Sequence, residues 1–255
     1  MILFSTIVVA QDKKIVFVLS AADTLALNKG NTLRQTGVFL NEFYLAYKAV
    51  SEAGYAVDFA TPSGIVATID NESFDEKYWK DFLTLREEAV SFVKTDSAFN
   101  SPITLEKALE DKHDYIGLVI PGGQGLMVDL IDDQNIPVLL KYFAKAQKPT
   151  GLICHAPSLI LTIPKKENPY IGFEATSVSP LEEFVIEKFI MKGKPENRKI
   201  AKQLRKSGLD YKQGLPKANY AVRDRNLVTS QNPFSSRAFN KLYLEALADY
   251  LKPGK

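Results

Sequence analysis

The chain has 255 residues, of which 45% are hydrophobic and 24% charged, so it can bury a substantial core and is neither disordered nor fibrous. Its 32 basic and 30 acidic residues nearly balance and form no basic block, so nucleic acid is not an expected partner. No apolar run approaches the about 18 residues that a membrane span requires, and the single cysteine excludes an internal disulfide.

The first residues allow several interpretations. MILFSTIVVA is apolar and ends at Ala10, before the polar QDKK, which is compatible with a signal peptide. It lacks a basic n-region and is shorter than the roughly 15 to 30 residues of such a signal, so a misassigned start codon or a simple first strand are the alternatives. Residues 1–13 are therefore interpreted as a signal peptide or a disordered N-terminus, and both a cytoplasmic location and export stay open.

From residue 14 onward, β-branched apolar runs alternate with helical stretches. Apolar residues recur at helical spacing over 37–54, and Gly54 stands where a C-terminal cap belongs. The expected strands are 14–20, 55–60, 115–120 and 151–154, with a hairpin at 220–230. This alternation predicts an α/β domain with a mostly parallel central sheet and helices on both faces.

Residues 61–100 break the alternation. The segment of about 65–100 is interpreted as an insertion carrying one helix within a single domain of residues 14–255. Further helices are expected from Ser158, near 181–189, at 197–207 and at 235–251.

Cys154 stands where the strand 151–154 runs directly into a helical pattern, in GLICHAPSLIL. This placement predicts a sharp strand-to-helix turn, a nucleophile elbow, with the sulfur near unpaired backbone N–H groups. Such a position lowers the pKa of a cysteine below its free value of about 8.5, which makes Cys154 a candidate nucleophile. On this segment alone, a buried and inert cysteine is the alternative.

Paired glycines end the preceding strand, in IPGGQG (120–125). Gly122 and Gly123 would let the backbone approach a ligand and direct N–H groups at an oxyanion, whereas the alternative is an ordinary tight turn. Because ligand sites in open α/β sheets lie at the carboxyl ends of the strands, we expect these glycines to lie beside Cys154.

Together the motifs resemble the ThiJ/PfpI superfamily, in its branch of glyoxalase III enzymes and heat-shock chaperones. The matching segments follow the family's order and spacing: TGVFLNEFYLAYKAVSEAGYAVDFATPSG (36–64), ATIDNES (67–73), IPGGQG, ICHAP, TSVSPLEE (176–183) and NLVTSQNPFSS (226–236). The resemblance covers most of the chain. It implies a flavodoxin-like sandwich, a homodimer and no cofactor.

The resemblance also implies roles for individual residues. Cys154 matches the nucleophile, and Glu42 matches the carboxylate of the early helix that contacts its sulfur. His155 matches the histidine of the family's Cys-His pair, and Glu183, with Glu182 as a near alternative, matches the acidic residue that orients it. A protonated Glu42 would donate to the thiolate.

Other assignments are less direct. The resemblance implies that the backbone N–H groups of Gly123 and His155 face an oxyanion. Without the resemblance, Glu42 and Glu183 would both be interpreted as surface charges, and His113, in the polar EDKHDY, is expected on the surface. With two histidines in the chain, a His-rich metal site is not expected.

Two pocket positions depart from the family's motifs. Gln124 stands where relatives usually have a histidine in Gly-Gly-His-Gly, and Ala156 stands where many have a glycine in Cys-His-Gly-Pro. Gln124 donates and accepts hydrogen bonds but cannot gain charge or transfer a proton in the physiological range. These departures bear on how efficiently the chain turns over methylglyoxal.

The function implied by the resemblance is conversion of a small carbonyl substrate, an α-oxoaldehyde such as methylglyoxal, into a hydroxy acid in carbonyl stress defence. Cys154 would form a hemithioacetal, and Glu42 or His155 would move the proton between carbons. Two alternatives stay open: a redox-sensing or chaperone-like dimer without turnover, and an amidotransferase- or peptidase-like hydrolase. The hydrolase is disfavoured because His155 directly follows Cys154, whereas amidotransferases place their histidine far downstream.

Overall fold

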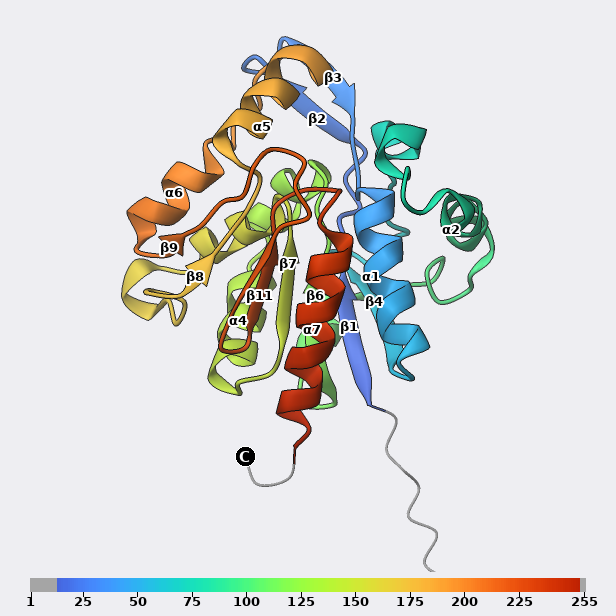
Figure 1. The fold of residues 1–255 in the computed structure, drawn as a ribbon, viewed down its shortest axis with the longest axis vertical. Coiled ribbons are helices and arrows are strands. Elements are labelled where there is room, and N and C mark those ends of the chain that lie inside the picture. Colours follow the sequence, from blue (N-terminus) through green and yellow to red (C-terminus); the bar gives the residue numbers. More distant parts are fainter. Residues whose placement is uncertain (1–12, 253–255) are drawn as a thin grey trace, which may run out of the picture.

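A computed structural model of the chain describes residues 13–252. It is built on a seven-stranded sheet in the order β10-β11-β7-β6-β1-β4-β5, in which only the β10–β11 pair is antiparallel (Figure 1). The strands of this sheet are β1 (Lys14–Val18), β4 (Ala56–Thr61), β5 (Ile103–Thr104), β6 (Tyr115–Ile120), β7 (Thr150–Ile153), β10 (Ala221–Asp224) and β11 (Leu227–Ser230). The predicted signal peptide ending at Ala10 lies outside the described residues.

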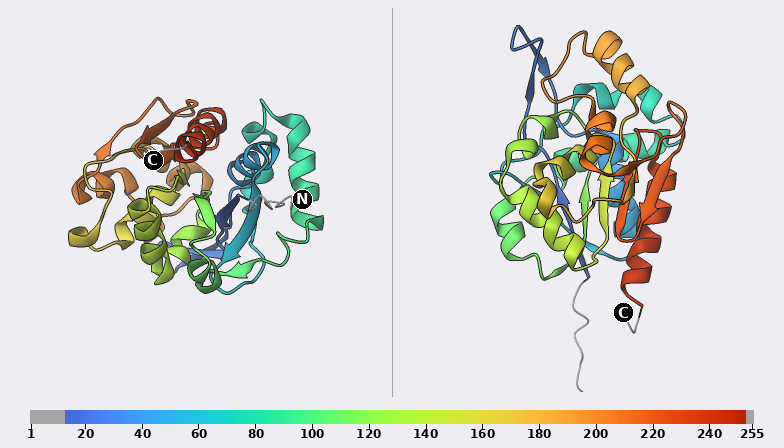
Figure 2. Two further views of the ribbon diagram at one scale, coloured as in Figure 1. Left: turned by 90° about the horizontal axis from the view of Figure 1, so that it is seen from below. Right: turned by 90° about the vertical axis from the view of Figure 1, so that its left-hand side faces the viewer.

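Helices cover both faces of the sheet, which confirms the predicted flavodoxin-like α/β architecture. In Figure 2, α1 and α7 lie side by side on one face, and α3 and α4 lie on the other. The α-helices are α1 (Leu40–Glu52), α2 (Leu83–Thr95), α3 (Leu105–Glu110), α4 (Asn135–Lys145), α5 (Pro180–Val185), α6 (Ile200–Ser207) and α7 (Ser236–Tyr250). A π-helix, Ile186–Ile190, continues α5. No helix in the described part of the chain is long and apolar enough to cross a membrane.

The central strands explain why the sequence could be interpreted as a parallel sheet. β1 and β6 are continuous apolar runs whose side chains are almost all buried, as expected for strands covered by helices on both faces. In α1, Phe43, Ala46 and Val50 face the core, and Gly54 adopts a left-handed φ of 86° just after the helix.

The predicted helices differ most from the structure in the segments that follow β7. The helix expected from Ser158 is instead a 3-10 helix, Ala156–Thr162, and the segment 181–189 is divided between α5 and the π-helix. The segment 61–100 holds α2 as its single α-helix, together with the 3-10 turns Asn71–Phe74 and Glu76–Tyr78. The other 3-10 turns are Gly125–Met127, Leu130–Asp132 and Lys165–Glu167.

A hairpin that was not predicted, β2 (Thr24–Leu27) with β3 (Thr32–Gln35), stands above the carboxyl ends of the sheet strands beside α5 (Figure 1). Leu25 and Leu27 pack against Met191 in a small separate hydrophobic cluster, and Leu27 forms a bridge with Pro195. The hairpin thereby fixes the segment that follows α5. The two remaining strands, β8 (Glu174–Ala175) and β9 (Asp210–Tyr211), pair with each other.

Candidate active site

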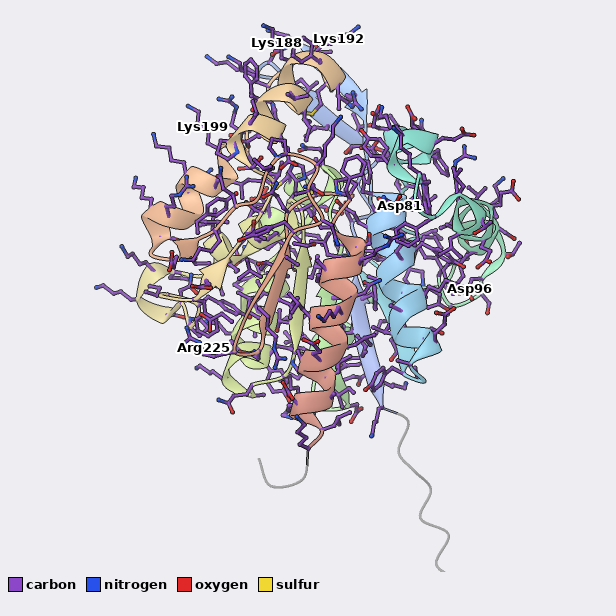
Figure 3. All side chains as sticks on the ribbon, in the orientation of Figure 1. Asp81, Asp96, Lys188, Lys192, Lys199 and Arg225 are labelled. Carbon is purple, nitrogen blue, oxygen red and sulfur yellow. The ribbon has the colours of Figure 1, made fainter. Side chains whose placement is uncertain are left out.

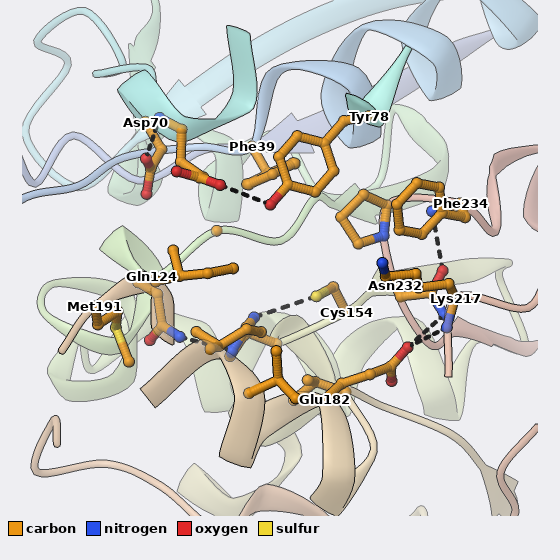
Figure 4. Close-up of a pocket in the computed structure, with 18 of the residues that line it drawn as sticks. Phe39, Asp70, Tyr78, Gln124, Cys154, Glu182, Met191, Lys217, Asn232 and Phe234 are labelled. Atoms are coloured by element: carbon orange, nitrogen blue, oxygen red, sulfur yellow. Dashed lines mark hydrogen bonds between the residues drawn. The ribbon is translucent and has the colours of Figure 1, made fainter. Parts of the chain in front are cut away.

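Cys154 lies at the turn between β7 and the 3-10 helix, with a left-handed φ of 58°. A non-glycine residue in this conformation costs about 1–2 kcal/mol, so surrounding contacts must hold it. The Cys154 N–H donates to the Ser230 carbonyl at 2.8 Å, and the Cys154 carbonyl accepts from the Val178 N–H at 2.9 Å. The predicted nucleophile elbow is therefore present, and Cys154 lines a pocket (Figure 4).

Glu42, in the first turn of α1, reaches Cys154 across Gly122. The start of the helix is tied to the glycine loop because the Phe39 N–H donates to the Gly122 carbonyl at 3.0 Å. A Cβ added at Gly122 would overlap Oε2 of Glu42 and would lie 2.8 Å from Cβ of Cys154. Glycine is required at this position because any side chain would occupy the space where the carboxyl group meets the cysteine.

The carboxyl group of Glu42 is buried in a dry environment. The residue is 2% exposed, and neither carboxyl oxygen makes a hydrogen bond of normal geometry within the described part of the chain. Burial raises the pKa of Glu42 from 4.5 to about 8, and the nearby Cys154 side chain and Gly122 backbone offset only part of this rise. At neutral pH the carboxyl group is therefore mostly protonated.

The imidazole of His155 connects Cys154 to Gln124. Its Nδ1 lies 3.2 Å from Sγ of Cys154, and its Nε2 lies 2.8 Å from Nε2 of Gln124 (Figure 4). An amide nitrogen can only donate, so Nε2 of His155 accepts, and Nδ1 carries the proton and donates it to the sulfur. Burial lowers the pKa of His155 from 6.5 to about 4, which keeps the ring neutral.

The thiol of Cys154 does not have the low pKa predicted from its place at a turn. Burial raises its pKa well above the ordinary value, and the nearby Glu42 and Glu182 raise it further. The His155 backbone N–H lowers the pKa, but by less than these effects raise it. The prediction overlooked desolvation, which disfavours the thiolate in a site this dry.

The predicted pairing of Glu183 with His155 is wrong. Both ring nitrogens of His155 lie against Cys154 and Gln124, while Oε1 of Glu183 accepts from the Lys199 N–H at 2.5 Å.

Glu182, the alternative partner of His155, lines the pocket, but its carboxylate makes hydrogen bonds to other residues. It forms a capping box with Ser179 at the start of α5 and accepts from the Lys217 N–H at 2.8 Å and from the Asn232 side-chain amide at 2.9 Å. The Ser-x-x-Glu spacing in TSVSPLEE is the signal that could have identified this capping role.

The pocket over Cys154 has a volume of about 270 Å³. Of the residues predicted for the site, Gly123, Gln124, Cys154 and His155 line it, whereas Glu42, Gly122 and Ala156 are buried behind the lining. Sequence reasoning did not foresee several other lining residues, among them Arg34, Phe39, Tyr78, Ile190, Asn232 and Phe234. Two of these, Asn232 and Phe234, stand in NLVTSQNPFSS, a segment used for the resemblance without a role in the pocket.

Gly123 has a φ of 110°, and a Cβ there would overlap the Gly37 carbonyl oxygen, so this position also requires glycine.

His113 is exposed, as predicted. Among residues 13–252, no group of three His, Cys, Asp or Glu side chains is placed to hold a metal ion.

Comparisons with known proteins agree with this fold. Over 241 residues the chain is 23% identical to the protein/nucleic acid deglycase HchA of Escherichia coli, covering 92% of this chain and 82% of that protein. The crystal structure of glyoxalase III from Candida albicans superposes with a TM-score of 0.76 at 21% identity, covering 92% of this chain and 97% of the other. The Francisella tularensis Rapid Encystment Protein 24 KDa gives a TM-score of 0.73 at 21% identity, covering 92% and 99% of the two chains. The model of the DJ-1/PfpI family matches residues 32–246, most of the sheet and every candidate site residue included, and the chain belongs to that family.

Proposed function

We propose that this protein is a cofactor-independent enzyme of the glyoxalase III type that converts α-oxoaldehydes into 2-hydroxy acids through a Cys154 hemithioacetal. The observation that carries the proposal is the contact between Cys154 and a buried Glu42 whose pKa is raised to about 8. A proton carrier works best when its pKa lies near the working pH. The likeness to HchA and to the Candida glyoxalase III supports the same class of chemistry.

The reaction begins with addition of Sγ to the aldehyde carbon C1, while the thiol proton passes to the aldehyde oxygen. C1 is then bonded to the sulfur, so a carboxyl group in contact with Sγ comes within reach of C1. In its ionised form, Glu42 removes the hydrogen of C1 as a proton. The electron pair of that bond forms a double bond between C1 and C2, and the electron pair of the C2 carbonyl moves onto its oxygen, which gives an enediolate. Glu42 returns the proton to C2, and the hydroxyl proton on C1 moves to the oxygen on C2, which leaves a thioester.

Water then hydrolyses the thioester, releasing the 2-hydroxy acid and restoring the thiol. C1 has been oxidised and C2 reduced by the same electron pair, so the sequence needs no external oxidant or reductant. Developing negative charge on oxygen requires donors, and the backbone N–H of Gly123, which lines the pocket, is assigned that role.

Two site features weigh against the alternative functions. A redox sensor reacts as an exposed thiolate, whereas Cys154 is buried and its pKa is raised. A hydrolase of the Cys-His-acid type orients its histidine with a carboxylate, whereas the ring nitrogens of His155 lie against Cys154 and Gln124.

The test is to follow loss of methylglyoxal and appearance of lactate with the purified protein. We expect turnover by the native protein, none by Cys154→Ala and none by Glu42→Gln. Glu52→Gln is a matched control, because Glu52 lies on the same helix but is exposed. Undiminished lactate formation by Cys154→Ala would refute the proposal.

A further inference from the structure

The pocket over Cys154 is much larger than methylglyoxal requires. Its volume is about 270 Å³. An apolar cavity of about 150 Å³ is already large enough for benzene. A three-carbon substrate bound at Cys154 would therefore leave most of the pocket empty.

The unused space is bounded by apolar side chains from α5 and the π-helix. Leu181, Val185, Ile186 and Ile190 all line the pocket, at intervals that place them on one side of the helical segment. Leu181 is 57% exposed although it lines this space, so a large apolar side chain stands partly in solvent in the wall of the pocket that also holds Cys154. Lys188, in the π-helix, and Lys192, just after it, do not line the pocket and lie at the top of the molecule in Figure 3.

Aromatic side chains form the opposite wall. Phe39 and Tyr78 meet edge to face with ring centroids 4.9 Å apart, and Tyr78 lies 5.8 Å from Phe234 (Figure 4). The Tyr78 hydroxyl donates to Oε1 of Glu72 at 2.8 Å, which leaves the ring of Tyr78 as its pocket surface. Cys154, His155 and Gln124 lie at the floor of the pocket. Charged residues also line it, but the carboxylates of Glu72 and Glu182 accept hydrogen bonds from Tyr78 and Asn232, so the surface between the two walls is mainly apolar.

The apolar wall is held in place by contacts at the edge of the pocket, made by Arg34 and Met191, which also line it. Nη1 of Arg34, on β3, donates to the Ile190 carbonyl at 2.7 Å. Met191, the next residue, packs against Leu25 and Leu27 of the hairpin. The space is therefore formed before any ligand arrives, which keeps the cost of binding low.

We infer that the substrates of this site are 2-oxoaldehydes, R–CO–CHO, whose substituent R is apolar and larger than methyl, of about butyl to phenyl size. The inference rests on the proposed function and specifies its substrate class. The dicarbonyl end lies at Cys154, and the substituent R lies between the α5 wall and the aromatic wall. The chemistry is unchanged: one water is consumed and the matching 2-hydroxy acid is released.

The experiment is to measure kcat/KM for straight-chain 2-oxoaldehydes from methylglyoxal to 2-oxohexanal. Burial of each added methylene should raise kcat/KM by up to about fourfold. Leu181→Asn should flatten this increase, because it places a polar group in the wall. Phe184→Asn is the matched control: Phe184 lies on the same helix at 51% exposure but does not line the pocket, so the increase should persist.

A kcat/KM that is flat or falls from methylglyoxal onward would overturn the inference while the proposed function stands. If no 2-oxoaldehyde is turned over, the proposed function fails, and binding decides the substrate class. Ligand-observed NMR with the Cys154→Ala protein would then compare 2-oxohexanal with methylglyoxal. Tighter binding of 2-oxohexanal that Leu181→Asn abolishes would support the apolar binding subsite without the substrate assignment, and equal binding of the two compounds would refute both.

Discussion

Replacing Glu42 by glutamine should stabilise the protein at neutral and alkaline pH while abolishing turnover. The folded protein holds the Glu42 proton up to a pKa of about 8, whereas the unfolded chain releases it near 4.5. The folded state therefore binds more protons between these two values, and the free energy of unfolding falls as the pH rises through this window. Glutamine has a similar shape but does not ionise, so the variant keeps the stability that the native protein loses as the pH rises.

The magnitude follows from the two pKa values. Each pKa unit corresponds to about 1.4 kcal/mol, so the lost stability is about 1 kcal/mol at pH 5, about 3 kcal/mol at pH 7 and about 4 kcal/mol at pH 8. No allowance for solvent screening is needed, because Glu42 is 2% exposed. Burying the glutamine amide adds a cost of its own, but that cost does not change with pH. The pH dependence of the difference between the two proteins is thus the diagnostic quantity.

The assay is urea unfolding followed by circular dichroism, for native protein and Glu42→Gln at pH 5, 7 and 8. The difference in free energy of unfolding should move by about 3 kcal/mol in favour of the variant between pH 5 and pH 8. Burial lowers the pKa of His155, which destabilises both proteins equally as the pH falls from 6.5 toward 4, and so cancels in the difference. The exposed Glu52→Gln should show no comparable change. A difference that is constant across pH would show that Glu42 is ionised in the folded protein and would refute the argument.

Three other predictions concern the same site. Iodoacetamide should label native Cys154 more slowly than a free cysteine at pH 7, as followed by mass spectrometry, because burial and Glu42 raise the pKa of the thiol. Rapid labelling at pH 6 would contradict this. In protein with ¹⁵N-labelled histidine, His155 should carry its proton on Nδ1 and not titrate between pH 5.5 and 8, and Gln124→Met should abolish the single tautomer. A proton on Nε2 in the native protein would reverse the assigned hydrogen bonds. Gly122→Ala should reduce turnover at least tenfold and cost about 1–3 kcal/mol of stability in urea unfolding, because its Cβ would overlap Glu42; unchanged turnover would show that the carboxyl group is not required at Cys154.

The long apolar strands were predictable, and the short elements were not. The strands that became β1 and β6 are recognisable because a parallel strand covered on both faces is apolar along almost its whole length. β4 is recognisable from its apolar residues on either side of Asp58. The hairpin of β2 and β3 has four residues in each strand, and its position depends on Met191 and Pro195, far along the chain. The two-residue strands β5, β8 and β9 are likewise set by partners distant in sequence.

In the site, the motifs located the residues but not their partners. Cys154, His155 and Gly123 are where the strand ends predicted, because those strands terminate at one edge of the sheet. The pairing of His155 with Glu183 was wrong, because adjacent residues on a helix point in different directions and their partners depend on the packing of the whole segment. The same limit applies to Gln124, whose contact with His155 depends on the conformation of the glycine loop.

Burial alone explains the direction of all three pKa shifts in the site. It raises the pKa of Glu42 and of Cys154 and lowers that of His155, so every one of these groups is held in its neutral form. A glutamine at position 124 fits such a site, because it supplies a hydrogen bond to His155 without adding an ionisable group. In the proposed reaction the thiol adds in its neutral form, and the base is the fraction of Glu42 that is ionised near its pKa of about 8. Glu42 is buried behind the pocket lining, so a substrate bound in the pocket would leave the environment that sets its protonation state in place, while covering Cys154 and His155 from solvent.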